Sequence, residues 1–186
     1  YSFLTRAQAL ALDGHFAIEQ EVRNKAGFFI NFNGTAGVWR KEAIYDAGNW
    51  HYDTITEDTD LSYRAQLRGW KFIYLNDVTS PAELPAEINA FKAQQFRWTK
   101  GTIEVAKKIL PTVWRSELPL RVKIQSTFHL AANIVFPFII LVALLNVPLV
   151  IIKNVMPQYG WYFDLMVIFT LASVSTFTFY TVAQYT

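Results

Sequence analysis

The chain has 186 residues, a net charge of +2 at pH 7 and no cysteine. The missing cysteines exclude disulfides, thiolate metal sites and cysteine nucleophiles, so any metal ion must be held by oxygen or imidazole ligands. Because the small net charge arises from interleaved acids and bases, the composition argues against a nucleic-acid-binding surface. Residues 124–186 carry only Lys153 and Asp164 as charged residues, which predicts a soluble-like part followed by an apolar part.

The sequence begins Tyr-Ser-Phe, with no initiator Met and no basic segment before an apolar stretch. This beginning is typical of neither a complete protein nor a signal peptide. We therefore expect the chain to be part of a longer protein.

The first 80 residues alternate between helical and extended patterns. Helices are indicated by apolar residues at helical spacing and by acids at the start and a glycine at the end, and strands by short aromatic and β-branched runs. The predicted segments are a helix over 4–23 that loosens near Gly14, a strand over 28–32 leaving through Asn33-Gly34, helices over 40–47 and 56–68, and a strand over 70–75. Helix followed by strand predicts an α/β domain.

A long helix is predicted from Pro85, which suits a first helical turn, to about Leu110. Its apolar residues lie among lysines, a pattern that fits a helix at a membrane surface and fits equally a helix packed on a soluble core. The sequence does not choose between the two.

Two membrane spans are predicted in the apolar part. The 23 residues from Leu130 to Ile152 carry no charge, and a bilayer core needs roughly 20 helical residues. A second span is predicted over about 162–182, so the two would form a helical hairpin joined by residues 153–160. Five basic residues precede the first span closely and only Lys153 follows it, so the positive-inside rule places residues 1–123 in the cytoplasm.

Thr56-Glu57-Asp58-Thr59-Asp60 is the densest acidic cluster of the sequence. Acids in a first helical turn commonly only stabilise the helix. A carboxylate there could instead take a proton from a hydroxyl nucleophile, or Asp58 and Asp60 could hold Mg²⁺ or Mn²⁺ against a diphosphate. Spacing alone leaves these three roles open.

A second candidate site lies in the predicted helix over 85–110. Gln94, Arg97 and Trp98 fall at i, i+3 and i+4 and share one helical face. The guanidinium could contact a diphosphate and the indole could stack on a sugar ring. Alternatively, Trp98 anchors the helix in a core or at a membrane interface and Arg97 forms a salt bridge. The three histidines lack partners at metal or triad spacing and are interpreted as structural or interfacial.

Together these motifs resemble processive family-2 glycosyltransferases, such as cellulose, mannan and related β-glycan synthases. Thr56-Glu57-Asp58 resembles the TED motif of that family, and Gln94-x-x-Arg97-Trp98, followed by membrane helices, resembles its QxxRW motif. The run Phe32-Asn33-Gly34-Thr35 resembles the acceptor-side F-x-G-[ST] turn. The string FNGTAGVWR is closer to the glucomannan and mannan synthase branch, because cellulose synthases usually have a cysteine in this turn.

The resemblance implies a fold, domains and residue roles. Residues 1–80 would be the acceptor-side half of a GT-A α/β catalytic domain, residues 81–123 amphipathic interface helices with the QxxRW motif, and residues 124–186 the transmembrane hairpin. Asp58 would be the catalytic base. The acceptor and diphosphate site would contain Glu57, Gln94, Arg97, Trp98, Phe32, Asn33, Gly34 and Thr35. The family's metal-binding Asp-x-Asp precedes its TED motif, so Mg²⁺ or Mn²⁺ would be bound mainly upstream of this chain.

The implied function is inverting transfer of a hexose from a nucleotide sugar, UDP-glucose or GDP-mannose, to a growing β-glycan. The enzyme would be a multi-pass membrane protein of the bacterial inner membrane, or of the Golgi or plasma membrane in a eukaryote, that exports its cell-wall polysaccharide. The chain alone would be inactive without the donor site. The alternatives are a non-processive transferase with a lipid acceptor and a non-catalytic membrane adaptor.

Overall fold

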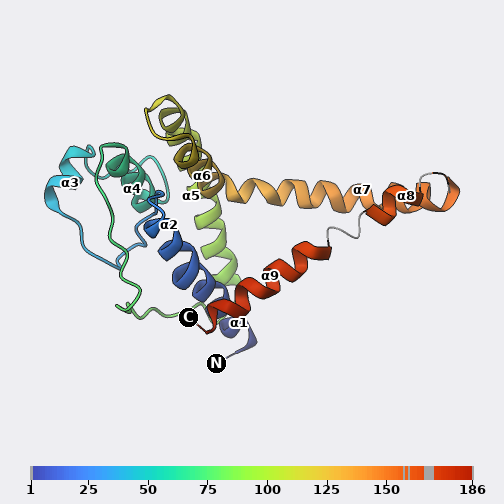
Figure 1. The fold of residues 1–186 in the computed structure, drawn as a ribbon. Helices are drawn as coiled ribbons and strands as arrows, with labels where there is room; N and C mark the ends of the chain where they lie inside the picture. Colours follow the sequence, from blue (N-terminus) through green and yellow to red (C-terminus); the bar gives the residue numbers. More distant parts are fainter. Residues whose placement is uncertain (1, 157, 159, 166–169, 186) are drawn as a thin grey trace. The chain divides into compact units, whose positions relative to one another are not determined.

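A computed structural model describes residues 2–156, 158, 160–165 and 170–185 of the chain (Figure 1). The chain divides into two compact units, Tyr1–Asn133 and Ile134–Thr186. All the candidate site residues lie in the first unit.

The first unit begins with three consecutive helical segments. They are α1 (Phe3–Asp13), a π-helix (Gly14–Gln20) and α2 (Glu21–Lys25). Ser2 caps α1, since its hydroxyl accepts a hydrogen bond from the Thr5 N–H at 3.2 Å. The loosening expected near Gly14 takes the form of a π-helix, whose wider turns occur often at functional sites.

Two further helices carry the acidic motif and its support. The short helix α3 spans Lys41–Asp46, and α4 spans Glu57–Leu67 with Thr56 at its N-cap position. The Thr56 side chain makes no capping hydrogen bond, so the expected hydroxyl cap is not formed. The acids of the first turn instead face the positive end of the α4 dipole.

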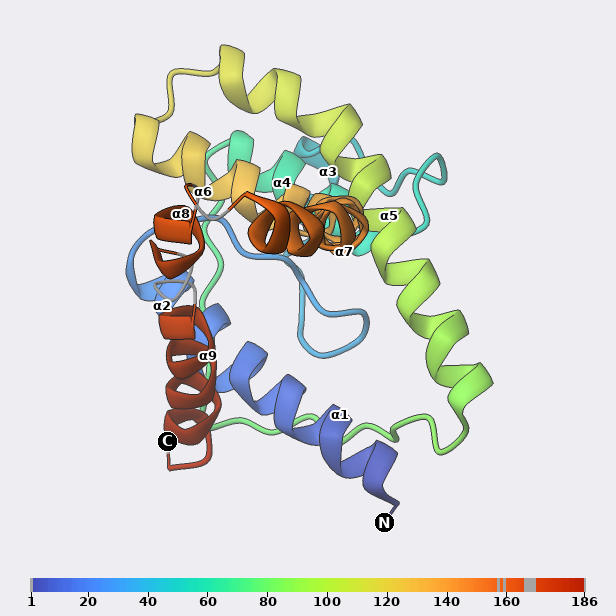
Figure 2. The same cartoon turned by 90° about the vertical axis from the view of Figure 1, so that its right-hand side faces the viewer.

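The long helix α5 spans Ile88–Arg115 and turns back into α6, Leu120–Ala131 (Figure 2). Helix α5 begins later than predicted and continues through Pro111 to Arg115. The main core is formed where α4, α5 and α6 pack together, and it contains Phe29, Tyr63, Val105, Ala106, Ile109, Val113, Val122 and Leu130. Burial raises the pKa of the Tyr63 hydroxyl, which lies 2.8 Å from His129 Nδ1 of α6.

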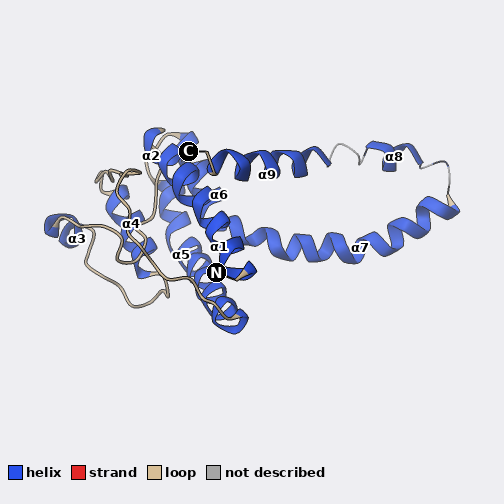
Figure 3. Cartoon of the chain, turned by 90° about the horizontal axis from the view of Figure 1, so that it is seen from below, coloured by secondary structure: helices blue, strands red, loops and turns tan. Residues whose placement is uncertain are grey.

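The predicted α/β fold is wrong for the part of the chain that the structure describes. Helices and loops, but no strands, are found there (Figure 3). A strand needs a partner that takes up its backbone N–H and C=O groups. In both predicted strands, side chains from helices fill that role, and the segments remain unpaired extended chain.

The segment predicted as the first strand binds along one face of α4. The backbone N–H groups of Ile30, Phe32 and Gly34 donate to the side chains of Gln66, Ser62 and Asp58, at 3.1, 2.8 and 2.8 Å. Successive donors are two residues apart and successive acceptors four residues apart. Two extended residues advance about 6.6 Å and four helical residues about 6 Å. The two repeats match, so the helix side chains replace a neighbouring strand.

The segment predicted as the second strand is held in a similar way by a single amide. Asn24 of α2 donates to the Phe72 carbonyl at 2.8 Å and accepts from the Tyr74 N–H at 3.0 Å. One asparagine thus provides the donor and the acceptor that one residue of a neighbouring strand would offer.

The second unit contains helices α7 (Val135–Val155), α8 (Gly160–Leu165) and α9 (Thr170–Ala183). A short 3₁₀ turn, Ala132–Ile134, precedes α7. Within the described residues, one helix is long and apolar enough to cross a membrane by length and composition, and it runs from Leu120 to Val155. The second predicted span, over about 162–182, includes residues 166–169, which lie outside the described residues, so the hairpin stays a prediction.

Candidate active site

Asp58 lies in the first turn of α4, where both of its carboxylate oxygens accept backbone hydrogen bonds. Oδ2 accepts from the Gly34 N–H at 2.8 Å, and Oδ1 accepts from the Thr59 N–H at 2.7 Å. The side chain is half-buried. The first contact joins the predicted base directly to the turn over 32–35, so the structure brings these two motifs together.

That turn is fixed by its own backbone and by aromatic packing. The Asn33 carbonyl accepts from the Ala36 N–H at 3.0 Å. Gly37 has a positive φ of 156°, and a Cβ atom there would lie 2.7 Å from the Phe32 ring. The Phe32 ring also packs on Trp39, with centroids 5.3 Å apart. Phe32 therefore shapes the turn, while Gly34 and the exposed Thr35 lie at its surface.

Gln94, Arg97 and Trp98 share a face of α5, as predicted from their spacing. Arg97 is exposed, Gln94 is half-buried, and 43% of Trp98 is exposed. Their side chains make no hydrogen bond or ion pair with the described residues, and Trp98 is not part of the core. The side chain of Glu57 is likewise exposed and forms no such contact within the described ranges.

Helix α5 meets the start of α4 one turn beyond Arg97. At Gly101 a Cβ atom would lie 2.5 Å from the Thr56 side chain, so only glycine allows this approach. At the next turn, Glu104 accepts a hydrogen bond from the Ile55 N–H at 3.1 Å. Because Arg97, Gly101 and Glu104 are spaced four and three residues apart, they lie along one side of α5. This packing directs the QxxRW face toward the acidic end of α4.

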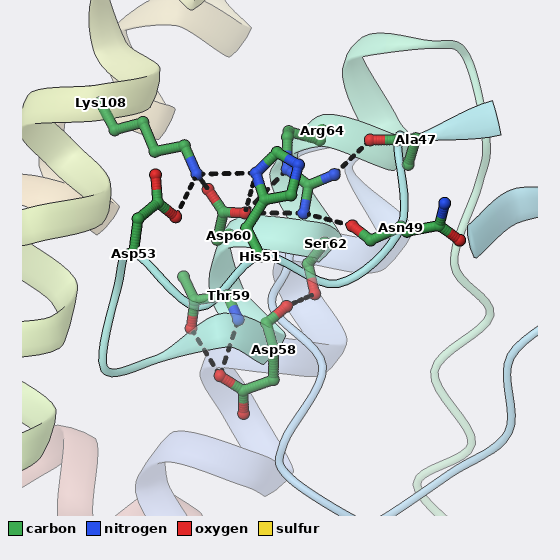
Figure 4. A network of polar contacts seen from close by, with 10 residues as sticks. All are labelled: Ala47, Asn49, His51, Asp53, Asp58, Thr59, Asp60, Ser62, Arg64 and Lys108. Carbon is green, nitrogen blue, oxygen red and sulfur yellow. Dashed lines mark hydrogen bonds and ion pairs between the residues drawn. The ribbon is translucent and has the colours of Figure 1, made fainter. Parts of the chain in front are cut away.

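A group of charged side chains secures the same junction (Figure 4). The Lys108 ammonium lies 2.8 Å from Asp53, 2.9 Å from the fully buried Asp60 and 3.0 Å from His51. Arg64 contacts the other Asp60 oxygen at 2.7 Å and donates to the carbonyls of Ala47 and Asn49. The carboxylates of Asp53 and Asp60 thus face the cationic groups of Lys108 and Arg64. The hydrogen bond from Lys108 is the main cause of a lowered pKa of Asp53.

The described side chains do not offer a divalent cation a suitable site. Ligand atoms of His51, Asp53 and Asp60 lie within 4.8 Å of one another, but the Lys108 ammonium already contacts all three. Asp58 and Asp60 do not converge: Asp60 faces Lys108 and Arg64, while the Asp58 carboxylate lies apart from that group (Figure 4). The donor set therefore fits an internal ammonium rather than Mg²⁺ or Mn²⁺.

Several contacts at this site were missed in the sequence, where Asp60 was considered only as a helix-stabilising acid, a base or a metal ligand. Asp60 and Arg64 are spaced at i, i+4, so their ion pair could have been anticipated. Lys108 is distant in sequence from its acidic partners and carries no local signal. Ser62 and Gln66 support the turn only because an extended segment happens to lie along α4, which no helical pattern reveals.

Comparisons with known proteins agree with these motifs. Residues 1–180 match the family model described as Glycosyl transferase family group 2. Glucomannan 4-beta-mannosyltransferase 1 of Oryza sativa subsp. japonica is 45% identical over 130 residues, which are 70% of this chain and 24% of that protein. Glucomannan 4-beta-mannosyltransferase 2 of Arabidopsis thaliana is 47% identical over 114 residues, covering 61% of this chain and 21% of the relative. No solved structure matches significantly.

A longer alignment covers nearly the whole chain. "Probable glucomannan 4-beta-mannosyltransferase 9" of Oryza sativa subsp. japonica is 35% identical over 184 residues, which are 93% of this chain and 34% of that protein. The chain thus spans only about a quarter to a third of the length of these curated relatives. The family assignment is nevertheless direct, because its model matches almost every residue. The chain belongs to glycosyl transferase family group 2.

Proposed function

We propose that this chain is the acceptor-side part of an inverting hexosyltransferase that extends a β-glycan. The observation that carries the proposal is the hydrogen bond from the Gly34 N–H to the Asp58 carboxylate. It joins the acceptor-side turn to the candidate base, two motifs that are separated in the sequence. The names of the relatives favour mannose as the sugar and a 4-linked mannan or glucomannan as the product.

In the proposed reaction Asp58 acts as general base. Its carboxylate takes the proton of an acceptor hydroxyl while the hydroxyl oxygen bonds to the anomeric carbon of the donor. The bond between that carbon and the phosphate oxygen breaks, and the nucleoside diphosphate leaves with the electron pair. The two N–H groups that hold Asp58 fix the direction of its lone pairs.

The exposed stripe on α5 would serve the substrates. Arg97 offers a planar guanidinium for the oxygens of a leaving diphosphate, and Trp98 offers a ring face for a sugar. Their lack of contacts within the described residues leaves both groups free for ligands. Gln94 would add an amide on the same side. The residues described here provide no site for Mg²⁺ or Mn²⁺, so we derive no step through a metal ion.

We further propose a membrane setting. The apolar helix from Leu120 to Val155 supplies the candidate span. The basic residues before it, against Lys153 alone after it, favour a cytoplasmic location for the first unit. In this setting the enzyme would synthesise its polymer processively and export it across the membrane.

Two other functions would give different results in one experiment. The full-length enzyme is incubated in membranes with radiolabelled GDP-mannose or UDP-glucose, Mg²⁺ or Mn²⁺ and a β-1,4-linked manno-oligosaccharide. We expect label in a polymer that a β-mannanase degrades. Label in a lipid fraction alone would indicate a lipid-acceptor transferase. No incorporation from either donor would favour a non-catalytic adaptor and contradict the proposal.

A further inference from the structure

Three amide side chains form a network next to the 32–35 turn. Gln20, at the end of the π-helix, is fully buried. Its amide nitrogen donates to the backbone carbonyl of Asn31 at 3.3 Å and to the Asn31 side-chain oxygen at 3.1 Å, and it lies 3.5 Å from the side-chain oxygen of Asn33. Asn31 in turn donates to Asn33 Oδ1 at 2.8 Å and to the Phe32 carbonyl at 3.3 Å.

Backbone carbonyls fix the orientation of the Gln20 and Asn31 amides, and these in turn fix that of Asn33. A carbonyl can only accept, so the Gln20 atom that bonds to the Asn31 carbonyl must be nitrogen. That nitrogen requires an oxygen opposite it on the Asn31 side chain. The Asn31 nitrogen therefore faces the Phe32 carbonyl and Asn33, and the inward atom of Asn33 must be its oxygen.

The outward atom of Asn33 is then its amide nitrogen. This nitrogen makes no hydrogen bond with the described residues, and it is not among the buried polar atoms that lack a partner, so it is open to solvent. The next residue, Gly34, donates its N–H to Asp58. The network thus presents a free N–H donor on the residue that precedes Gly34, whose own N–H binds the proposed base.

The burial of Gln20 carries a free-energy penalty. Its side-chain oxygen is buried and has no hydrogen-bond partner. A buried polar atom without a partner calls for an explanation, because an apolar side chain of similar size would avoid the loss of hydration. The donor half of the amide supplies that explanation, since its hydrogen bonds orient Asn31 and, through it, Asn33.

We propose that Gln20 is a positioning residue that holds the Asn33 amide nitrogen toward the acceptor, where it donates to a sugar hydroxyl oxygen. The inference rests on the proposed function and deepens it by assigning a residue remote from the substrate to acceptor recognition. Without Gln20 the Asn33 amide can rotate and present its oxygen, which accepts where a donor is needed.

The test uses Gln20→Met in the full-length enzyme, with Gln8→Met as matched control. Gln8 is also buried, and it donates to the carbonyls of Leu4 and Pro85, away from the turn. Initial rates are measured against GDP-mannose and against mannohexaose. For Gln20→Met we expect KM for mannohexaose to rise about tenfold, the loss of one oriented hydrogen bond, with KM for GDP-mannose within about twofold. Gln8→Met should change neither constant.

A second comparison separates positioning from general stability. If Gln20 acts through Asn33, Gln20→Met should add almost nothing to the effect of Asn33→Ala, because the two share one interaction. Independent, additive effects would overturn the proposal, as would an acceptor KM in Gln20→Met equal to that of Gln8→Met. Should Gln20→Met fail to fold, Asn31→Ala interrupts the same network, and an unchanged acceptor KM there would also overturn it. A wild-type enzyme without transferase activity would instead refute the proposed function.

Discussion

Replacing Lys108 by methionine tests whether charge contacts hold α5 against α4. The methionine keeps most of the side-chain length and removes the ammonium that contacts Asp53, Asp60 and His51. Removing one partner of a buried ion pair typically costs about 3–5 kcal/mol. Arg64 still contacts Asp60 at 2.7 Å, so the buried carboxylate keeps one cation. We therefore expect a loss of about 2 kcal/mol, below the usual range.

The assay is thermal unfolding of the chain in detergent, followed by tryptophan fluorescence. For a chain of this size a loss of about 2 kcal/mol lowers Tm by roughly 4–8 °C. Lys107→Met is the matched control, because Lys107 is exposed on the same helix, and surface changes usually stay within about 0.5 kcal/mol. In a double-mutant cycle, the variant that combines Lys108→Met with Asp60→Asn should be about 1–2 kcal/mol more stable than the sum of the two single effects predicts. Equal Tm values for Lys108→Met and Lys107→Met would refute the reasoning.

Three further predictions concern the stripe, the charges and the orientation. In the full-length enzyme, Arg97→Lys and Trp98→Ala should each lower polymer synthesis at least about tenfold without loss of membrane insertion, because lysine lacks the bidentate fork; wild-type rates would leave the stripe a packing feature. The hydrogen bond from Lys108 is the main cause of the lowered pKa of Asp53. The charged Asp53 carboxylate therefore stabilises the folded chain above its ordinary pKa of 3.8, and this stabilisation is lost as the pH falls through the lowered pKa of the folded state. An NMR titration should show that pKa return toward normal in Lys108→Met. Asn33 begins the sequence Asn-Gly-Thr, which is an acceptor motif for N-glycosylation. If the first unit is cytoplasmic, the protein expressed in eukaryotic cells should carry no glycan at Asn33 that an endoglycosidase removes. Such a glycan would contradict the proposed orientation.

Local patterns were sufficient to predict the helices that carry the two candidate motifs. The acidic start and the glycine end located the helix that the structure shows as Glu57–Leu67, because capping and dipole effects depend on neighbouring residues. The long helix at Ile88–Arg115 was predicted with less accurate ends. The helix continues through Pro111, and Val113 beyond it lies in the core, a long-range packing that the sequence does not display.

The strands failed for a reason that local patterns cannot contain. Aromatic and β-branched residues favour an extended backbone, but a sheet also requires a second strand. In the described residues Gln66, Ser62 and Asn24 take up the backbone groups of the extended segments. The two predicted strands were therefore wrong, because the described residues supply no second strand for either segment.

The candidate site was only partly accessible from the sequence. Spacing along one helix predicted the shared face of Gln94, Arg97 and Trp98, since residues three and four apart are neighbours. The contact between Gly34 and Asp58 depends on the chain folding back, and it could be expected only from the family resemblance. The roles of Lys108 and the Asn33 amide network appear only when distant segments are seen together.

The central claim is that Asp58 is the general base, and Asp58→Asn in the full-length enzyme tests it most directly. Asparagine keeps the size and most of the hydrogen-bond acceptor capacity of aspartate at a helix N-terminus, but it cannot take up the acceptor proton. Polymer synthesis from radiolabelled GDP-mannose should fall by orders of magnitude, while membrane insertion and the affinity for GDP with Mn²⁺ stay close to wild type. A joint fall in nucleotide affinity and rate would indicate a metal ligand instead, and near-normal synthesis by Asp58→Asn would contradict the proposed mechanism.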